Sequence, residues 1–450
     1  MMKKSLILVL LFVSYLQPSF AQQYKEGIVN RRFDLFQVGD TVKVVGVKTN
    51  DVSGRIQYAI KVPYQTVLVN MDRVDLLPDD FSYWDNLWFE NRAIDVADKG
   101  WESKNRELLS IEAMEYADEI KQNNLLFEDE LLYDYLYQLI FKIHPNYLIK
   151  DKNRVFHIII IKSTEPTYFS FENGMIVLTT GAIASANTEQ ELVNMLAESV
   201  ANIVLDHNLI NLNHAIRAEN RARTWGNIAA FASAAVMAYN GERNGVYYSF
   251  DDALNIGLAA SYLTYENLQR IGANYNQKQL ELTRQASQIF WENNSHYFMK
   301  DRSQFIALTS NAVSYTAWQE FHSKNYEYAL KLAEKLESMG MAMAEEYLLL
   351  SKLYRKLGND LDSNLQALEY IKNAKTMDDG RIIDLDLEEG LIYFRMEDYN
   401  NASKAFHQYK EQLLSLNDSD PRVKTDLKFI NQLLHRFQMN DDSTIGLTKD

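Results

Sequence analysis

The stretch from Phe169 to His207 reads FSFENGMIVLTTGAIASANTEQELVNMLAESVANIVLDH and decides the fold. Its first half predicts a short buried strand, Met175 to Thr179, followed by a turn at Gly181. Its second half predicts a helix, because Thr188 and Glu191 stand as the N-cap and N3 residues of a capping box. Apolar residues then recur at helical spacing (Leu192, Met195, Leu196, Ile203 and Val204).

The residues before this stretch continue the same pattern. Residues 128–143 carry apolar side chains at helical spacing, and residues 155–161 form an apolar, β-branched run that predicts a buried strand. His157 lies inside this run, so we expect a packed or hydrogen-bonded histidine rather than a metal ligand. Trp84 and its aromatic neighbours are expected to be core residues that seat the preceding segment on this domain.

The order of features over residues 169–197 is an aromatic residue, Asn-Gly, an apolar strand, Thr-Gly, a capped helix and Leu-Ala. This order resembles the segment before the zinc helix in the HtpX and CAAX-prenyl-protease family of metallopeptidases. The resemblance covers residues 131–273 and implies a gluzincin-type domain that acts in envelope protein quality control. It also implies a strand that lies along a bound peptide, here Gly174, Met175, Ile176, Val177, Leu178 and Thr179.

The zinc helix of that family carries His-Glu-x-x-His. Two histidines four residues apart hold zinc on one side of a helix, and the glutamate activates the bound water. The resemblance places Glu198, Ser199 and Asn202 at these three positions. Tyr265 stands where the family has a third ligand, a glutamate on a later helix. The resemblance therefore implies that the metal ligands and the catalytic base are lost, and that the protein has no cofactor.

Three residues stay open as ligands of a different metal site, namely Glu198, His207 and Glu266. Glu266 is one position away from the family's ligand, which turns its side chain by about 100° around a helix axis. We favour a polar helix surface instead, because zinc sites need three histidine or carboxylate ligands with ordered neighbours. The sequence has no Gly-x-Ser-x-Gly motif, so a serine hydrolase is not indicated.

Residues 22–80 have a different pattern from the rest of the chain. β-branched runs at 42–47, 58–62 and 67–69 are separated by Gly-Asp, Asn-Asp and Ser-Gly turn signals. This pattern predicts a small β module that resembles bacterial SH3-like domains. Such a module is typical of a binding or docking role, and one hypothesis is that it binds cell-wall glycan.

Residues 311–437 have the pattern of helical repeats. The segments at 325–329, 359–364 and 397–402 each follow one amphipathic helix and precede another, with a spacing close to the tetratricopeptide period of about 34 residues. Repeats of this kind stack into a surface that binds proteins or unfolded polypeptides. The polar residues 438–450 are expected to form a disordered tail.

The N-terminal residues predict export. Two lysines precede an apolar run from Ser5 to Tyr15, and Ser19-Phe20-Ala21 supplies small residues for cleavage before Gln22. Residues 1–21 therefore read as a signal peptide for a bacterial periplasm. Residues 227–239 are apolar but too short to span a membrane, so we expect no transmembrane segment after cleavage.

The composition excludes several classes of function. The chain has no cysteine, which excludes disulfides, thiol catalysis, thiolate metal sites and a lipid anchor on cysteine. A formal net charge of −15 argues against a nucleic-acid partner, because phosphate binding needs clustered lysine and arginine.

These observations predict a mainly α protein with a small β module, a metallopeptidase-like α+β domain over residues 81–310 and tetratricopeptide-like repeats. Our leading hypothesis is a non-catalytic pseudo-peptidase of the cell envelope that binds polypeptides or scaffolds an assembly through its groove and repeats. The alternative is an active zinc-dependent metalloendopeptidase of the same family, acting in periplasmic protein quality control.

Overall fold

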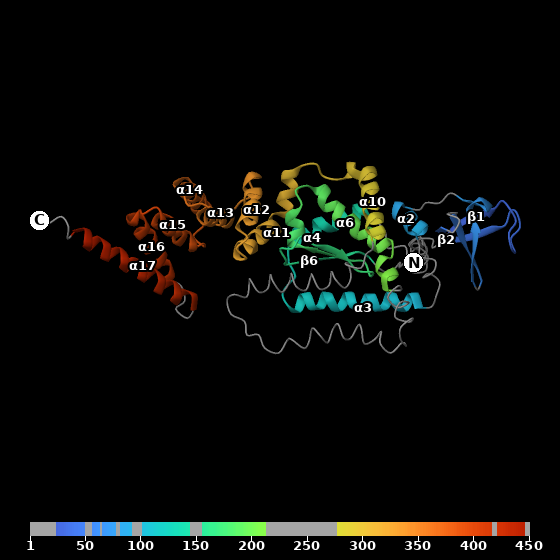
Figure 1. The fold of residues 1–450 in the computed structure, drawn as a ribbon, viewed down its shortest axis with the longest axis horizontal. Coiled ribbons are helices and arrows are strands. Elements are labelled where there is room, and N and C mark those ends of the chain that lie inside the picture. Colours follow the sequence, from blue (N-terminus) through green and yellow to red (C-terminus); the bar gives the residue numbers. More distant parts are fainter. Residues whose placement is uncertain are drawn as a thin grey trace, which may run out of the picture. The chain divides into compact units, whose positions relative to one another are not determined.

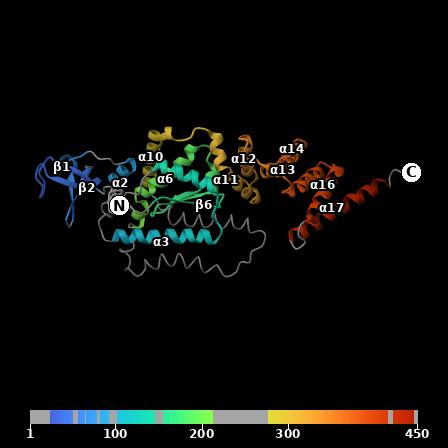
Figure 2. The same ribbon diagram turned by 180° about the vertical axis from the view of Figure 1, so that it is seen from behind.

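The computed structural model describes residues 24–49, 56–63, 65–77, 82–91, 101–144, 155–212, 277–415 and 421–445. The protein is mainly α, with an N-terminal antiparallel sheet, a small mixed sheet and a run of paired helices in the C-terminal half (Figures 1 and 2). The chain folds into two compact units, and the second begins at Asp301. The segment Ile183–Asn187 also belongs to the second unit. The expected signal peptide, residues 227–239, Tyr265 and Glu266 lie outside the described residues.

The N-terminal sheet has five antiparallel strands in the order β4-β3-β2-β1-β5. Three of the strands match the β-branched runs of the sequence, which confirms those predictions. The 3-10 helix η1 (Met71–Arg73) joins the two edge strands β4 and β5. The strands are β1 (Lys25–Val29), β2 (Thr41–Thr49), β3 (Ile56–Val62), β4 (Gln65–Asn70) and β5 (Val74–Leu76).

Helix α2 (Tyr83–Asn91) connects this sheet to the helical part of the first unit. It buries Trp84, Trp88 and Phe89, and the Trp84 indole N–H donates to the Ile143 carbonyl at 2.7 Å. On the sheet side, Lys25 Nζ donates to Asn86 Oδ1 at 2.7 Å and lies 5.0 Å from the centre of the Phe89 ring. The predicted role of these aromatic residues, to seat the β module, is therefore confirmed.

The small sheet has the order β6-β8-β7. The strands are β6 (His157–Ile161), β7 (Tyr168–Ser170) and β8 (Met175–Thr179). The central strand β8 is parallel to β6 and antiparallel to β7, and all five of its residues are buried. The predicted strands at both positions are confirmed. His157 is an exception, because its side chain is exposed at the start of β6 rather than packed.

Helices complete the first unit: α3 (Trp101–Gln122), α4 (Glu130–Ile143), α6 (Glu189–Val204) and α10 (Gln277–Asn294). The short helix α5 (Thr180–Ser185) begins in the first unit and ends in the second. Helix α6 begins where its capping box predicts, because Thr188 Oγ1 accepts from the Glu191 N–H at 3.3 Å. The predicted turn at Gly181 is wrong, since this residue lies inside α5. Glycine is required there by packing, because a Cβ atom would stand 2.1 Å from the Thr164 carbonyl oxygen.

The C-terminal unit is a run of helix pairs. Its helices are α11 (Arg302–His322), α12 (Tyr326–Ser338), α13 (Ala344–Leu357), α14 (Leu361–Met377), α15 (Asp384–Arg395), α16 (Tyr399–Ser415) and α17 (Pro421–Ile445). The three recurring segments of the sequence lead into α12, α14 and α16, as predicted. The tail expected from residue 438 is instead helical as far as Ile445, since no proline or glycine follows Pro421 until Gly446.

None of the described helices combines the length and the apolar character that crossing a membrane requires.

Asn364 is the irregular member of the three repeats. It occupies the place that Ala329 and Ala402 hold in the other two pairs, and all three residues are buried. Its Oδ1 atom is buried and has no hydrogen-bond partner in the part of the chain that the structure describes. A buried acceptor without a partner costs about 1–3 kcal/mol.

We therefore expect Asn364→Ala to raise the free energy of unfolding by about 1 kcal/mol, because the unsatisfied oxygen is removed. Urea unfolding of the full chain, followed by circular dichroism, measures this change. Asn373→Ala on the same helix is the control for helix propensity, since Asn373 is only half-buried. A lower urea midpoint for Asn364→Ala than for the unmodified chain would contradict the prediction.

Candidate functional site

Helix α6 carries two of the predicted site residues, Glu198 and Asn202, four positions apart on one side. Glu198 Oε2 accepts a hydrogen bond from the Tyr168 hydroxyl group of β7 at 2.8 Å. Burial, and then the charge of Glu198 and this hydrogen bond, raise the pKa of Tyr168 above its usual value of 10, while Arg284 acts in the opposite direction. The hydroxyl group therefore stays protonated and donates to Glu198 over the neutral range.

Asn202 is held by two buried partners. Its Oδ1 atom accepts from the Thr283 hydroxyl group of α10 at 2.8 Å and from His207 Nδ1 at 3.0 Å. His207 thereby lies beside Asn202, whereas the sequence left it open as a metal ligand together with Glu198. Its Nδ1 atom, which points at an amide oxygen, is engaged as a donor.

The polar contacts continue along both helices. Gln279 Nε2 donates to Asn211 Oδ1 at 3.1 Å, and the Ser287 hydroxyl group donates to the Asn194 carbonyl at 3.3 Å. We call this set the polar seam: Tyr168, Glu198, Asn202, His207, Asn211, Gln279 and Thr283. The seam lets α10 pack on the polar side of α6, because Asn202 and the Asn194 carbonyl meet hydrogen-bond donors of α10 there.

Ser199, at the position of the family's catalytic base, faces the interior. It is fully buried, and its hydroxyl group donates to the Met195 carbonyl of the preceding turn at 2.9 Å. Its own carbonyl accepts from the Ser170 hydroxyl group of β7 at 3.1 Å. The Ser199 hydroxyl group is therefore buried and hydrogen-bonded within its own helix.

The described residues contain no group of three histidine, aspartate or glutamate side chains that could hold a metal ion. Glu198 and His207 are both placed in the polar seam. The other two positions of the sequence analysis, Tyr265 and Glu266, fall outside the described residues.

The family resemblance implies a strand from Gly174 to Thr179 along a bound peptide. Met175 to Thr179 form β8, which has a neighbouring strand on each side, and Gly174 precedes it. A peptide that joins this sheet would therefore have to pair with β6 or β7. On β6, the N–H groups of Ile158 and Ile160 donate to the hydroxyl groups of Tyr137 and Tyr133, at 3.2 and 3.0 Å. On β7, the Ser170 carbonyl accepts from Asn208 Nδ2 at 3.0 Å.

An ion cluster that the sequence did not predict lies at the end of α6. Arg106 of α3 donates to Glu172 Oε1, and its two terminal nitrogens reach the Asp206 carboxylate at 3.0 and 3.2 Å. Both carboxylates are buried. These residues lie 66 and 100 positions from Arg106, so no local spacing could have pointed to them.

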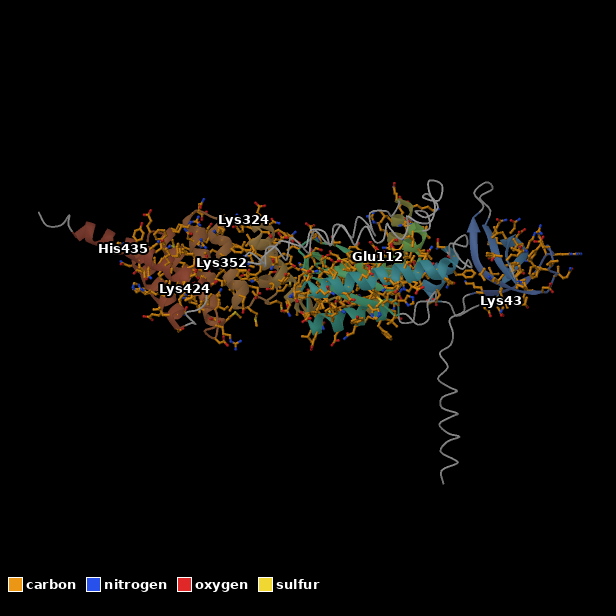
Figure 3. All side chains as sticks on the ribbon, turned by 90° about the horizontal axis from the view of Figure 1, so that it is seen from below. Lys43, Glu112, Lys324, Lys352, Lys424 and His435 are labelled. Atoms are coloured by element: carbon orange, nitrogen blue, oxygen red, sulfur yellow. The ribbon has the colours of Figure 1, made fainter. Side chains whose placement is uncertain are left out.

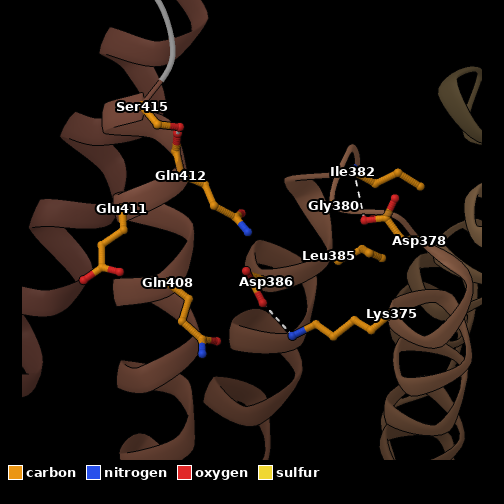
Figure 4. Close-up of a pocket in the computed structure, with 10 residues that line it drawn as sticks. All are labelled: Lys375, Asp378, Gly380, Ile382, Leu385, Asp386, Gln408, Glu411, Gln412 and Ser415. Carbon is orange, nitrogen blue, oxygen red and sulfur yellow. Dashed lines mark hydrogen bonds and ion pairs between the residues drawn. The ribbon is translucent and has the colours of Figure 1, made fainter.

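A pocket of about 570 Å³ lies in the C-terminal unit, between α14, α15 and α16. Figure 4 shows the amide side chains of Gln408 and Gln412 on one wall and the Lys375–Asp386 pair on another. Lys375 Nζ lies 2.5 Å from Asp386 Oδ1, so the only basic residue of the lining is already neutralised. Sequence reasoning missed this pocket because its lining comes from three helices.

A scan against protein-family models found no match for this chain, and a search of curated proteins found none. The resemblance over residues 131–273 therefore rests on the residues alone.

The raised pKa of Tyr168 predicts a loss of stability in alkali. The unfolded tyrosine ionises near pH 10 and the folded one only at higher pH, so its contribution to stability is complete below pH 10 and declines as the pH rises above it. We expect Tyr168→Phe to make this decline shallower, although the loss of the bond to Glu198 lowers stability at pH 8. Urea midpoints between pH 8 and about 11.5 measure both effects.

Tyr297→Phe is the control for the alkaline series, because the Tyr297 side chain is largely exposed. It should leave the decline unchanged. Equal declines for Tyr168→Phe and the unmodified chain would show that Tyr168 ionises as readily in the folded protein as in the unfolded one.

Proposed function

We propose that this protein is a non-catalytic polypeptide-binding protein of the cell envelope, with a degenerate metallopeptidase-like domain and tetratricopeptide-like repeats. The observation that carries this proposal is a row of apolar side chains on the helix pairs. In each pair, one such residue is the last or second-last residue of the first helix, and another is the first residue of the second helix. The residues are Phe321 and Tyr326, Leu357 and Leu361, and Phe394 and Tyr399, and we call them the turn ridge.

The turn ridge is available to a partner. Its four members in the second and third pairs are between 39% and 60% exposed. The rings of Phe321 and Tyr326 lie 5.4 Å apart and those of Phe394 and Tyr399 lie 6.0 Å apart, so each aromatic pair forms one surface. Exposed apolar groups that recur at one place on a repeat are typical of protein-binding surfaces. Unfolded polypeptides offer matching apolar side chains.

The polar seam supports the non-catalytic part of the proposal. Glu198 and Asn202 occupy the positions of two zinc ligands in the family that the sequence resembles, and both are hydrogen-bonded within the fold. A metal ion would have to displace Tyr168 and Thr283 from these partners. Under this proposal the five-stranded sheet is an SH3-like docking module, and the exported chain acts in the periplasm.

A first experiment locates the binding surface. A photo-reactive phenylalanine analogue is placed at Leu361 or Tyr399 of the turn ridge, and reduced, carbamidomethylated lactalbumin serves as a permanently unfolded partner. We expect cross-linking at both positions, at several times the yield of two controls. The controls are Leu414 of α16 and Leu131 of α4, which are 57% and 72% exposed but lie outside the ridge. Equal yields at all four positions, or none, would remove the basis of the proposal.

A second experiment tests the loss of the metal. Protein purified without added metal is expected to contain well below one zinc ion per chain and to show no chelator-sensitive cleavage of casein. The reason is that Glu198 and Asn202 are engaged by Tyr168 and Thr283. Atomic emission spectrometry measures the zinc, and a zinc endopeptidase carried through the same purification is the control. Near-equimolar zinc together with chelator-sensitive cleavage would favour the active metalloendopeptidase instead.

A further inference from the structure

The second and third helix pairs are joined by a buried carboxylate. Glu388 of α15 is fully buried and accepts two hydrogen bonds from the Arg355 guanidinium group of α13, from Nε to Oε1 and from Nη2 to Oε2, the latter at 2.8 Å. Lys352 Nζ, labelled in Figure 3, lies 3.8 Å from the same carboxylate. A paired bond of this geometry is strong and directional, and removing one partner leaves a buried charge uncompensated.

A second contact runs from the end of α15 back to the end of α13. The Arg395 guanidinium group donates to the carbonyls of Arg355 and Gly358 and to Asn359 Oδ1. The Arg355 carbonyl lies in the last turn of α13 and Gly358 is its C-cap residue, so both carbonyls stand where backbone oxygens lack partners within the helix. The positive charge also complements the helix dipole there. Arg395 therefore caps α13 from the neighbouring pair.

A third contact ties α15 to α14. Lys375 Nζ lies 2.5 Å from Asp386 Oδ1 and 2.5 Å from Glu389 Oε2. Helix α15 is thus bound through charged groups to both helices of the preceding pair. Buried, directional charge contacts of this kind are either made or broken, because breaking one leaves an uncompensated buried charge.

We propose that α13, α14, α15 and α16 form one rigid block, locked by Glu388 and Arg395. Stacked helical repeats unfold approximately pair by pair when their interfaces are weak, and a locked interface makes two pairs open together. The block holds Leu357, Leu361, Phe394 and Tyr399 of the turn ridge in one arrangement before any partner arrives. This consequence rests on the proposed function, and a preformed surface binds without the cost of ordering it.

Hydrogen exchange of the full chain, read by mass spectrometry, tests the lock. In the unmodified protein, α13 and α15 are expected to show the same protection. Arg395→Lys keeps the charge but cannot reach three acceptors, so amides of α13 should exchange about 10- to 100-fold faster than before, while those of α11 stay unchanged. Glu388→Gln keeps the shape of the side chain but removes its charge. It should likewise make the exchange rates of α13 and α15 differ from each other.

Arg381→Lys is the matched control, because the Arg381 side chain is 84% exposed and pairs only with Asp379 among the contacts described. It should leave every exchange rate within about twofold, as surface pairs contribute little. The lock is refuted if Arg395→Lys and Glu388→Gln behave like this control, or if α13 and α15 already exchange independently in the unmodified chain. A third outcome separates the two proposals. If the two variants uncouple the exchange of α13 from that of α15, but lactalbumin does not cross-link to the turn ridge, the rigid block is upheld and the proposed function is refuted.

Discussion

The first unit depends on one constraint, the complete burial of strand β8. Its backbone N–H and C=O groups need partners within the protein, and β6 and β7 supply them on its two sides. Helix α6 then packs near β7, and the chain reaches it through α5, which Gly181 allows to approach the Thr164 carbonyl. The positions of Glu198 and Asn202 follow from this arrangement, because α6 presents one side to β7 and α10.

In both units, hydrogen bonds between buried polar side chains join separate helices. The polar seam joins α6 to α10 through neutral hydrogen bonds and α6 to β7 through the Glu198 carboxylate, whereas Glu388 joins two helix pairs through full charges. Neutral hydrogen bonds and ion pairs respond differently when one partner is lost. Neutral bonds can exchange partners at moderate cost, but a buried ion pair that loses one member is strongly destabilising. A buried ion cluster of this second kind also occurs in the first unit, where Arg106 meets the buried carboxylates of Glu172 and Asp206.

The elements that were predicted correctly are determined by residues that lie close together in the sequence. Thr188 and Glu191 are three positions apart, so the start of α6 could be predicted without knowledge of the fold. Gly181 and His157 were misjudged because their surroundings are not local: packing against Thr164 keeps Gly181 in a helix, and His157 stands where β6 emerges to solvent. The partners within the polar seam lie up to 81 positions apart, and one chain offers no signal for such pairs.

The tyrosine hydroxyl groups on β6 have a consequence beyond this molecule. Strand β6 reads HIIII, a β-branched apolar run of the kind that joins neighbouring chains into intermolecular sheets when its edge is open. Tyr133 and Tyr137 occupy two of the N–H groups through which such a sheet would grow. On the same edge, the Phe127 N–H donates to the Ile160 carbonyl and the Lys162 N–H donates to the Leu125 carbonyl. Groups of the same chain therefore occupy this edge of β6, in place of the lysines or prolines that usually protect a strand edge.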